Sequence, residues 1–456
     1  MSTGVQMVGA LLIGFTPLLA FTHKLVGGTE DCGRVFITVS SLWRPAPHGR
    51  GLVDRELELN WDASGCPPQA VPDSIALFGA HPHSNTHPER PEPLVRVDTK
   101  DLPEGFYKTN VSLGLPKYPG GWNKEDADSA RADGDHCFPF WVASFRNNSL
   151  LQSACFKIRP TWMGDNREVL GSATLTSLFI PGTHNSASHH QGPTLTRRDT
   201  LARYLLTQDT DVWGQLVHGV RYLDLRVAYY PFLNKTHGAD HRFWINHDLI
   251  RIGPLLPVLR DIKRFLTATK REVVILDLHR FPVGFYGRQG RHRRLVTLLK
   301  QELGPYALPS SADLRSATLE QIWSQDRRLV VAYGDRQVAK ESAWLWPPLT
   351  QVWGNQHEPS DLGTYLRQVM GKSPGHRANS ELWAVMAELT PTPVDVMFRQ
   401  SGSLRQMADS VNRNVTAWFR RLWWREANVV ATDFFLGNDI VGVAVEANLR
   451  RASGER

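Results

Sequence analysis

Two histidines, His184 and His247, each follow a short apolar segment with the composition of a buried strand, and Asp433 follows a third such segment. Histidine changes charge near neutral pH with little tuning, so histidines at strand ends are candidates for proton transfer. The three residues therefore indicate acid–base chemistry, provided that the fold brings them together.

Four further ionisable residues lie on two other predicted strands. Asp224 and Arg226 alternate with apolar residues in residues 219–227, and Asp277 and His279 do the same in residues 272–281. Successive side chains of a strand point to opposite faces, so each pair is expected on one face of its strand.

Each of these residues also has an ordinary structural explanation. A histidine after a strand is commonly a surface residue, and Asp433 can cap a loop. Asp224 and Arg226 can form a simple salt bridge. The convergence of several strand ends favours function, because burying titratable groups at one end of a fold costs free energy unless chemistry requires them.

The second part of the chain alternates strand-like segments with helix-length segments. The strand-like segments are residues 177–183, 219–227, 243–248, 272–281, 328–334, 349–354, 382–389 and 428–435. This alternation predicts an α/β fold with a parallel sheet, and eight strands predict a distorted TIM-like (β/α) barrel over residues 168–450. Active sites of such barrels lie at the carboxyl ends of the strands, where the ionisable residues are found.

The first part of the chain has a different pattern. Between residues 30 and 162, short β-type runs are separated by Pro, Gly, Asn and Asp, which predicts an antiparallel β-sandwich domain. With 456 residues, 41% of them hydrophobic, the chain is long enough for two domains with separate cores. The net charge of +7 is spread without a long run of one sign, so we expect no nucleic-acid partner.

The amino-terminal residues favour the secretory pathway. Residues 7–21 carry no charge and resemble the apolar region of a signal peptide, which we place at residues 1–22. An uncleaved anchor and a buried first strand are the alternatives. Sequons at Asn110, Asn147, Asn234 and Asn414 suit a glycosylated protein, so we expect a secreted protein or one of the secretory-pathway lumen.

The cysteines agree with this location. All four lie in the first third of the chain, and an even count in a secreted protein predicts disulfides. Cys137 and Cys155 flank strand-like segments, which favours one bridge between them and another between Cys32 and Cys66, among three possible connectivities.

The order and the amino-acid sequences of these segments resemble those of a known family. The sequences PGTHNS at residues 181–186, GVRYLDLR at 219–226, INHD at 245–248, VVILDLHRF at 273–281 and VVATDFF at 429–435 are similar to the X-region barrel of phosphatidylinositol-specific phospholipases C. The likeness is to proteins that contain the X domain alone and to the bacterial single-domain enzymes.

The resemblance implies a hydrolase that cleaves phosphatidylinositol or a glycosyl-inositol lipid to diacylglycerol and a cyclic or linear inositol phosphate. By position, His184 would be the general base that takes the proton of the ring 2-hydroxyl. His247 would be the general acid that protonates the departing glycerol oxygen, and Asp433 would orient His184. The implied partners are an inositol phospholipid substrate and a membrane surface that the protein contacts peripherally.

Arg226 decides the expectation about a metal. Calcium-dependent members of the family have an acidic residue at this strand position, whereas a guanidinium would repel calcium and neutralise the phosphate itself. The resemblance therefore implies an enzyme without a metal or a cofactor. Asn185 departs from the bacterial pattern, which has an aspartate that assists the acid histidine; Asp224 or Asp248 could substitute for it.

Three residues are expected to contact the substrate: His279, Tyr333 after the fifth strand, and Glu388 after the seventh. For Tyr333 and Glu388, a place in the core or in a salt bridge is the alternative. The tryptophan-rich residues 418–424 predict either a contact with the membrane interface or a helix buried against the barrel.

Two other functions stay open. A glycerophosphodiesterase-like or sphingomyelinase-like barrel needs a cluster of metal-binding carboxylates, which Arg226 opposes. A catalytically weak or inactive module that binds inositol lipid or membrane is the second alternative, because Asn185 cannot supply the charge of an aspartate. The presence of His184, His247 and Asp433 together argues against it.

Overall fold

The structure is a computed structural model and describes residues 32–45, 52–53, 55–82, 91–129, 136–189, 201–235, 241–371, 381–398 and 402–455. The predicted signal peptide at residues 1–22 lies outside these residues. The chain divides into two compact units. The smaller unit comprises Met1–Ile37, Glu58–Thr109 and Pro139–Cys155, and the larger comprises Thr38–Leu57, Asn110–Phe138 and Phe156–Arg456.

Antiparallel strands form in the first part of the chain, as predicted. A four-stranded sheet has the order β6-β5-β8-β9, a three-stranded sheet has the order β1-β4-β7, and β2 pairs with β3. That the larger sheets pack face to face as a sandwich stays a prediction. The strands are β1 (Arg34–Val39), β2 (Arg44–Pro45), β3 (Leu52–Val53), β4 (Glu56–Asp62), β5 (Ser74–Phe78), β6 (Val95–Asp98), β7 (Glu104–Ser112), β8 (Cys137–Arg146) and β9 (Ser149–Lys157).

The four cysteines are all oxidised. Cys32 and Cys66 form a disulfide, as predicted. Cys137 and Cys155 are also disulfide-bonded, and no cysteine is free. Disulfides persist in oxidising compartments, so they fit a secretory or extracellular location.

The larger unit is built on a curled parallel sheet in the order β16-β15-β14-β11-β10-β19-β18-β17. Within the described residues β16 and β17 are its two edges, so the sheet is open where the sequence predicts a barrel. The strands are β10 (Ile180–Thr183), β11 (Tyr222–Tyr229), β14 (Val274–Arg280), β15 (Leu329–Tyr333), β16 (Leu345–Trp346), β17 (Thr350–Val352), β18 (Trp383–Met386) and β19 (Val429–Thr432).

One predicted barrel strand has a different place. Residues 243–248 are expected as the third parallel strand, but β12 (Phe243–His247) pairs antiparallel with the end of β11 and continues into β13 (Ile250–Pro254). β14 takes the parallel position beside β11 instead. β11 extends past its pairing with β14, which ends at Arg226, and β12 pairs antiparallel with this extension.

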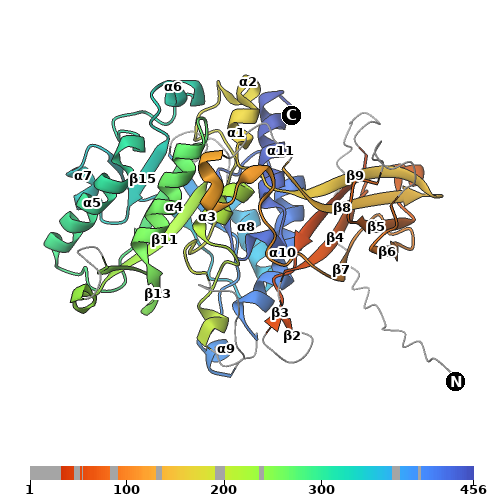
Figure 1. The fold of residues 1–456 in the computed structure, drawn as a ribbon, viewed down its shortest axis with the longest axis horizontal. Helices are drawn as coiled ribbons and strands as arrows, with labels where there is room; N and C mark the ends of the chain where they lie inside the picture. The colour runs from red at the N-terminus through yellow and green to blue at the C-terminus, as the bar shows by residue number, and fades with distance from the viewer. Residues whose placement is uncertain are drawn as a thin grey trace. The chain divides into compact units, whose positions relative to one another are not determined.

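Helices lie around the curled sheet (Figure 1). The apolar face of α4, for example, buries Leu259, Ile262 and Phe265, and the helix shows the 3.6-residue period of a half-exposed helix. The helices are α1 (Trp162–Asp165), α2 (Arg167–Leu170), α3 (Val212–His218), α4 (Leu255–Ala268), α5 (Gln289–Leu303), α6 (Leu319–Ser324), α7 (Arg336–Lys340), α8 (Pro359–Met370), α9 (Pro393–Phe398), α10 (Leu404–Arg421) and α11 (Ile440–Ala452).

Tryptophans of the predicted interfacial segment are mostly core residues. Trp418, Trp423 and Trp424 are buried. Trp418 and Trp423 pack against each other, so this segment follows the alternative of a buried helix. No helix within the described part of the chain is long and apolar enough to cross a membrane.

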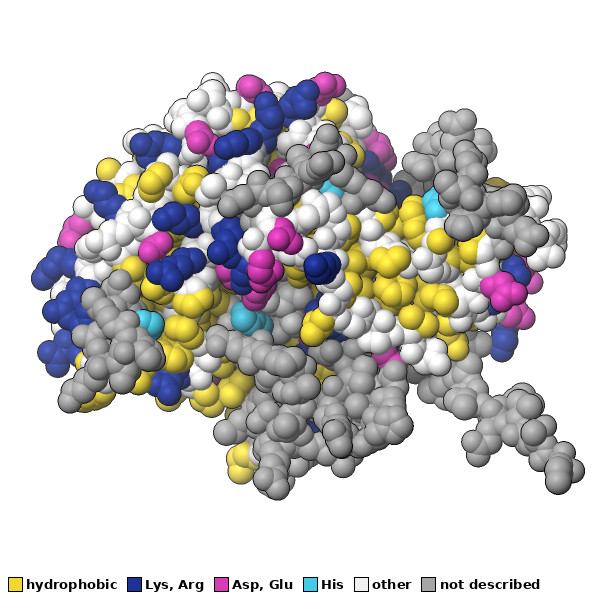
Figure 2. Space-filling model, in the orientation of Figure 1, with side chains coloured by type: hydrophobic (Ala, Val, Ile, Leu, Met, Phe, Trp, Pro, Cys, Tyr) yellow, Lys and Arg dark blue, Asp and Glu magenta, His cyan; other side chains and the backbone are white. Residues whose placement is uncertain are grey.

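Basic side chains occur over much of the larger unit, but their density on the surface varies. Figure 2 shows Lys and Arg gathered most densely at its left edge, where Figure 1 places α5. The net charge of +7 is spread over the whole sequence, but basic residues are frequent within α5.

A buried ion pair holds the amino ends of β11 and β14 together. Arg221 and Glu272 are both fully buried, and the Nη2 and Nε atoms of Arg221 lie 2.6 and 2.8 Å from Oε2 of Glu272. Arg221 also donates to the carbonyls of Leu216 and Pro160. This cluster lies at the opposite end of the strands from the ionisable residues described above.

Arg221→Met is expected to lower the free energy of unfolding by about 3–5 kcal/mol, because it leaves Glu272 buried without its partner. Urea denaturation of the full chain measures the change. Arg315→Met, which removes an exposed pair with Asp313, is the control and should change little. Equal effects of the two substitutions would contradict the role given to the buried pair.

Candidate active site

The carboxyl ends of the parallel strands are where the ionisable side chains gather. Deeper in the sheet the inward side chains are apolar: Ile180, Ile275, Met386 and Ala431 belong to one buried cluster. Side chains two or four positions farther along point to the same side, because strand side chains alternate. The residues at these positions are His184, Asp277, His279, Glu388 and Asp433. Their side chains therefore lie together beside the apolar interior, at the carboxyl end of the strands.

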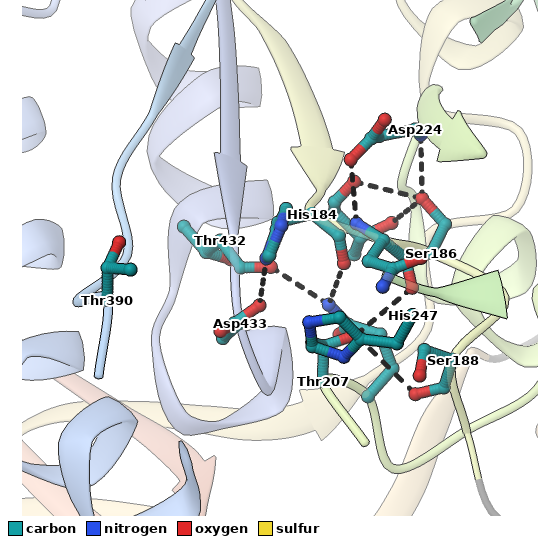
Figure 3. A network of polar contacts seen from close by, with 12 residues as sticks. His184, Ser186, Ser188, Thr207, Asp224, His247, Thr390, Thr432 and Asp433 are labelled. Atoms are coloured by element: carbon teal, nitrogen blue, oxygen red, sulfur yellow. Dashed lines mark hydrogen bonds and ion pairs between the residues drawn. The ribbon is translucent and has the colours of Figure 1, made fainter. Parts of the chain in front are cut away.

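His184 lies between a carboxylate and a guanidinium. Its Nδ1 is 2.9 Å from Oδ1 of Asp433, and its Nε2 is 2.7 Å from Nη2 of Arg226. Arginine has donors only, so Nε2 accepts the hydrogen bond and Nδ1 carries the proton that it donates to Asp433. Figure 3 shows His184 pointing toward Asp433. The arrangement is that of a neutral imidazole oriented by a buried carboxylate.

The carboxylates around His184 favour its protonated form. Burial acts to lower the pKa, but Asp433 and Glu388 outweigh it and raise the pKa of His184 to about 9, with Arg226 opposing them. The guanidinium and a proton therefore compete for the same lone pair on Nε2. In the structure Arg226 holds it, and the raised pKa means that a proton replaces the guanidinium there as the pH falls through about 9.

Arg226 is surrounded by further acidic side chains. Its Nη2 lies 4.0 Å from Oδ2 of Asp224, and its Nη1 lies 3.8 Å from Oδ1 of Asp248. Its Nε is buried without a hydrogen-bond partner among the described residues. The guanidinium thus has donor capacity left for an oxygen-rich anion.

His247 faces His184 from the β12–β13 hairpin. The two ring centroids are 6.4 Å apart and the rings are perpendicular. Nδ1 of His247 lies 2.6 Å from the carbonyl oxygen of Leu205, which fixes the proton on Nδ1 and leaves Nε2 to exchange a proton. Burial lowers the pKa of His247, and His184 and Arg226 add to this.

The loop after β10 is fixed by Asp224. Asn185 has a left-handed backbone with φ of 42°, and its N–H donates to Oδ2 of Asp224 over 2.9 Å. The backbone N–H of Asp224 in turn donates to Oγ of Ser186. Burial acts to raise the pKa of Asp224, but Arg226 and His184 lower it. The ionised carboxylate therefore positions the loop that carries His184.

Two residues of this arrangement were not found from the sequence. Ser186 links β10 to β11, and Gln208 donates to the carbonyls of His184 and Thr432. Ser186 is part of the PGTHNS motif, so the motif could have indicated it. Nothing in the sequence around Gln208 marks it, because its partners are backbone atoms of segments distant in the chain.

The side chain of Asn185 is fully buried, and neither amide atom has a hydrogen-bond partner among the described residues. An unpaired buried amide costs free energy and is a common feature of sites that await a polar ligand or water. Asn185 therefore keeps a donor and an acceptor beside the two histidines, although it carries no charge.

A second histidine–aspartate pair lies on β14. Nδ1 of His279 is 3.1 Å from Oδ2 of Asp277, which also accepts a hydrogen bond from the Tyr222 hydroxyl. Gln351 links this pair to the first group, since its Nε2 contacts the Tyr222 hydroxyl and Oδ1 of Asp224. Burial acts to lower the pKa of His279, but Asp277 raises it.

Glu388 belongs to the same group. It is buried, and its Oε2 has no hydrogen-bond partner among the described residues. Burial raises its pKa to about 7; His184 and Arg226 lower the pKa, whereas Asp433 and Asp224 raise it. A carboxyl that titrates near neutrality can accept or donate a hydrogen bond to a substrate hydroxyl.

Tyr333 is the one predicted site residue that the structure does not bring to this group. Its hydroxyl is 2.9 Å from Nδ1 of His292 on α5, and its ring packs against Phe281. The reason is the alternation of β15: Val330 and Ala332 point into the interior, so Tyr333 points outward to the helices. Tyr333 therefore follows the alternative of a core residue.

Asp224 and Asp277 are paired on the adjacent strands β11 and β14. Arg226 and His279 lie two residues farther along the same two strands, so basic side chains stand beside the two carboxylates. Within the part of the chain that the structure describes, no three His, Cys, Asp or Glu side chains are grouped so as to hold a metal ion.

Comparisons with known proteins agree with the sequence motifs. No family model matches the chain. The chain is 27% identical to the human (Homo sapiens) PI-PLC X domain-containing protein 3 over 319 residues, which cover 64% of this chain and 95% of that protein. It is 29% identical to the variant-surface-glycoprotein phospholipase C of Trypanosoma brucei brucei over 238 residues, or 46% of this chain and 63% of that protein.

Among solved structures, a mutant of the phosphatidylinositol-specific phospholipase C from Staphylococcus aureus matches 63% of this chain and 97% of that chain. The TM-score is 0.49 and the sequence identity 16%. The resemblance to X-domain proteins found in the sequence is confirmed by the curated relatives that carry this name.

Asp433→Asn is expected to lower the pKa of His184, because it removes the carboxylate that contributes most to raising it. Titration of the His184 ring by NMR measures the change against the wild-type protein. A pKa that stays near 9 in the variant would contradict the pairing.

The same shift predicts how stability depends on pH. The pKa of His184 is raised from 6.5 to about 9, so the folded state binds this proton more tightly than the unfolded chain. The stabilisation is complete below pH 6.5 and is lost as pH rises through about 9. Urea denaturation of wild type and His184→Gln at several pH values should show a difference that shrinks above pH 6.5; a difference independent of pH would refute it.

Proposed function

We propose that this protein is a phosphoric diester hydrolase that cleaves inositol phospholipids by acid–base catalysis with His184 and His247, without a metal. The observation that carries the proposal is His184, held between Asp433 and Arg226 and 6.4 Å from His247. The similarity to proteins named for the X domain and for phospholipase C supports the substrate class.

His184 acts as the base once substrate binds. The phosphate is a better partner for the guanidinium than a neutral ring nitrogen, because two oxygens can accept two parallel N–H bonds. Arg226 then turns from Nε2 of His184 to the phosphate. The freed Nε2 takes the proton of the ring 2-hydroxyl as that oxygen attacks phosphorus, and Asp433 stabilises the imidazolium that forms.

His247 acts as the acid. Its Nδ1 proton is held by the Leu205 carbonyl, so the proton that it donates must be a second one, carried on Nε2. A lowered pKa makes this proton easy to give to the departing glycerol oxygen. Diacylglycerol leaves, and the product of the first step is a cyclic inositol phosphate.

The pKa values of His184 and His247 determine which of the two histidines carries a proton before the reaction. The raised pKa of His184 and the lowered pKa of His247 favour a protonated His184 and a neutral His247, which is the reverse of what the first step requires. The hydrogen bond from Arg226 to Nε2 is available only to the neutral form of His184, so it favours the state that the first step requires. The reversed state is the one that hydrolyses the cyclic ester, with His247 activating water.

Arg226 performs the task that calcium would perform at this position. It places a fixed positive charge at the phosphate, where negative charge develops during the attack. His279 and Glu388 are the candidates for contacts with ring hydroxyls, since both lie in the same group and Oε2 of Glu388 lacks a partner among the described residues.

A binding module without turnover is the second candidate, and Asn185 is the observation that favours it. Its buried amide has no partner among the described residues and supplies no charge to His247. Such a protein would bind inositol lipid through Arg226 and leave it intact.

The test of the two functions is incubation of the full chain with phosphatidylinositol and a chelator, followed by phosphorus NMR. We expect a cyclic inositol phosphate, with a loss of roughly 100-fold or more in His184→Ala and His247→Ala. Tyr333→Phe is the control, because Tyr333 lies outside the group, and should keep its rate. Binding to the lipid without turnover would instead support the second candidate, and dependence on calcium would rule out the role of Arg226.

The membrane contact is proposed at the same end of the sheet. Two large apolar side chains stand out into solvent there: Phe232, after β11, is 89% exposed, and Leu249, in the β12–β13 turn, is 73% exposed. Leu249 lies two residues from His247, so inserting it into a lipid surface would bring the histidines to the head groups.

Phe232→Ser combined with Leu249→Ser is expected to weaken binding to phosphatidylcholine vesicles by tenfold or more, since burying each side chain contributes roughly 1.5–3 kcal/mol. Vesicle sedimentation measures it. Hydrolysis of a water-soluble inositol phosphodiester should be unaffected, and an unchanged vesicle affinity would exclude this surface as the membrane contact.

A further inference from the structure

The loop between β14 and α5 is fixed on the end of β11. Gly284 has a φ of 84°, and a Cβ there would lie 2.3 Å from the carbonyl oxygen of Tyr229, so the loop approaches too closely for any other residue. Phe285 is buried against Phe281, whereas the next residue, Tyr286, is fully exposed. The loop is therefore a rigid support that presents one aromatic side chain to solvent.

The residues after this loop are strongly basic. Residues 288–303 contain five basic residues, Arg288, Arg291, Arg293, Arg294 and Lys300, against one acidic residue, Glu302. Glu302 lies 3.6 Å from Lys263 of α4 and does not neutralise the arginines. Arg288, Arg293 and Arg294 are exposed, and Figure 2 shows basic side chains gathered over α5. We call residues Arg288, Arg291, Arg293 and Arg294 the arginine surface.

The arginine surface lies at the same end of the sheet as the candidate active site. The guanidinium of Arg291 is 4.7 Å from the centre of the Tyr229 ring, and Nη1 of Arg294 donates to the Tyr229 hydroxyl over 3.1 Å. Tyr229 is three residues from Arg226 on β11, a distance of about 10 Å along a strand. The arginines are thus close to the site but outside it.

We propose that the arginine surface binds anionic lipid head groups and gives the protein a preference for negatively charged membranes. The inference rests on the proposed function, because it names the kind of surface on which the site would work. Tyr286, two residues before Arg288, is fully exposed, and Phe232 and Leu249 are exposed in the segments that follow β11 and β12. An anionic membrane has negative head groups that can bind the arginines and an apolar layer that can bury the exposed apolar side chains. A nucleic acid would satisfy the arginines but leave the apolar side chains exposed.

The test compares two variants of the full chain on vesicles of phosphatidylcholine with and without phosphatidylglycerol. Arg288→Glu combined with Arg293→Glu should weaken binding to the anionic vesicles by at least tenfold, because each basic residue near an anionic surface contributes roughly fivefold to partitioning. Binding to pure phosphatidylcholine should change little, and added salt should remove most of the difference.

The matched control is Arg167→Glu combined with Arg315→Glu. These arginines are exposed, precede β10 and β15 in the chain, and change the net charge by the same amount at the opposite end of the strands. The control should bind anionic vesicles like wild type. Equal binding of both variants, or weakened binding to a DNA duplex with unchanged vesicle binding, would overturn the proposal.

Phosphatidylglycerol has no inositol, so this result does not depend on catalysis. If no cyclic inositol phosphate forms but the vesicle preference is found, the proposed function fails and the lipid surface stands. If turnover occurs and both variants bind anionic vesicles equally, the lipid surface fails and the proposed function stands.

Discussion

The chemistry proposed for this protein depends on one imidazole ring with a carboxylate on one nitrogen and a guanidinium on the other. Asp433 raises the pKa of His184, and Arg226 occupies the nitrogen on which the added proton would reside. The two influences oppose each other: the ring is neutral while Arg226 holds Nε2, and it gains a proton readily when Arg226 leaves. A base of this kind is inactive toward solvent and becomes strong when an anion attracts the guanidinium.

The strand order of the curled sheet brings these groups together. β10 lies between β19 and β11, so the strand ends carrying Asp433 and Arg226 flank the one carrying His184. The amide of His184 also donates to the carbonyl of Thr432 on β19. His247 comes from outside the parallel sheet, on a hairpin that folds back from the end of β11. Backbone hydrogen bonds thus hold each strand that carries one of these residues. Substrate binding then needs little further ordering of the backbone or side chains.

The sequence predicted much of this arrangement because alternation along a strand is a local property. The sides of β11 and β14 on which Asp224, Arg226, Asp277 and His279 lie could be inferred from neighbouring residues alone. The pairing of His184 with Asp433 required the family resemblance, because 249 positions separate them. The outward position of Tyr333 follows from the same alternation, since Val330 and Ala332 of β15 lie in the interior.

Other features could not be read from the sequence. The antiparallel direction of β12 depends on how far β11 extends beyond the sheet, and the raised pKa of Glu388 depends on burial beside distant charges. Gln351, which joins the two histidine–aspartate pairs, lies on a strand with no motif. The arginine surface is local in sequence, but its relation to the site depends on contacts with Tyr229.

The most direct test of the account is rescue of an Arg226→Gly variant. The variant should lose formation of cyclic inositol phosphate, and guanidinium added to the solution should restore part of the rate in the presence of a chelator, because the charge is what the phosphate requires. Restoration by calcium, or failure of chelated wild-type protein to form the product, would contradict the central role of Arg226.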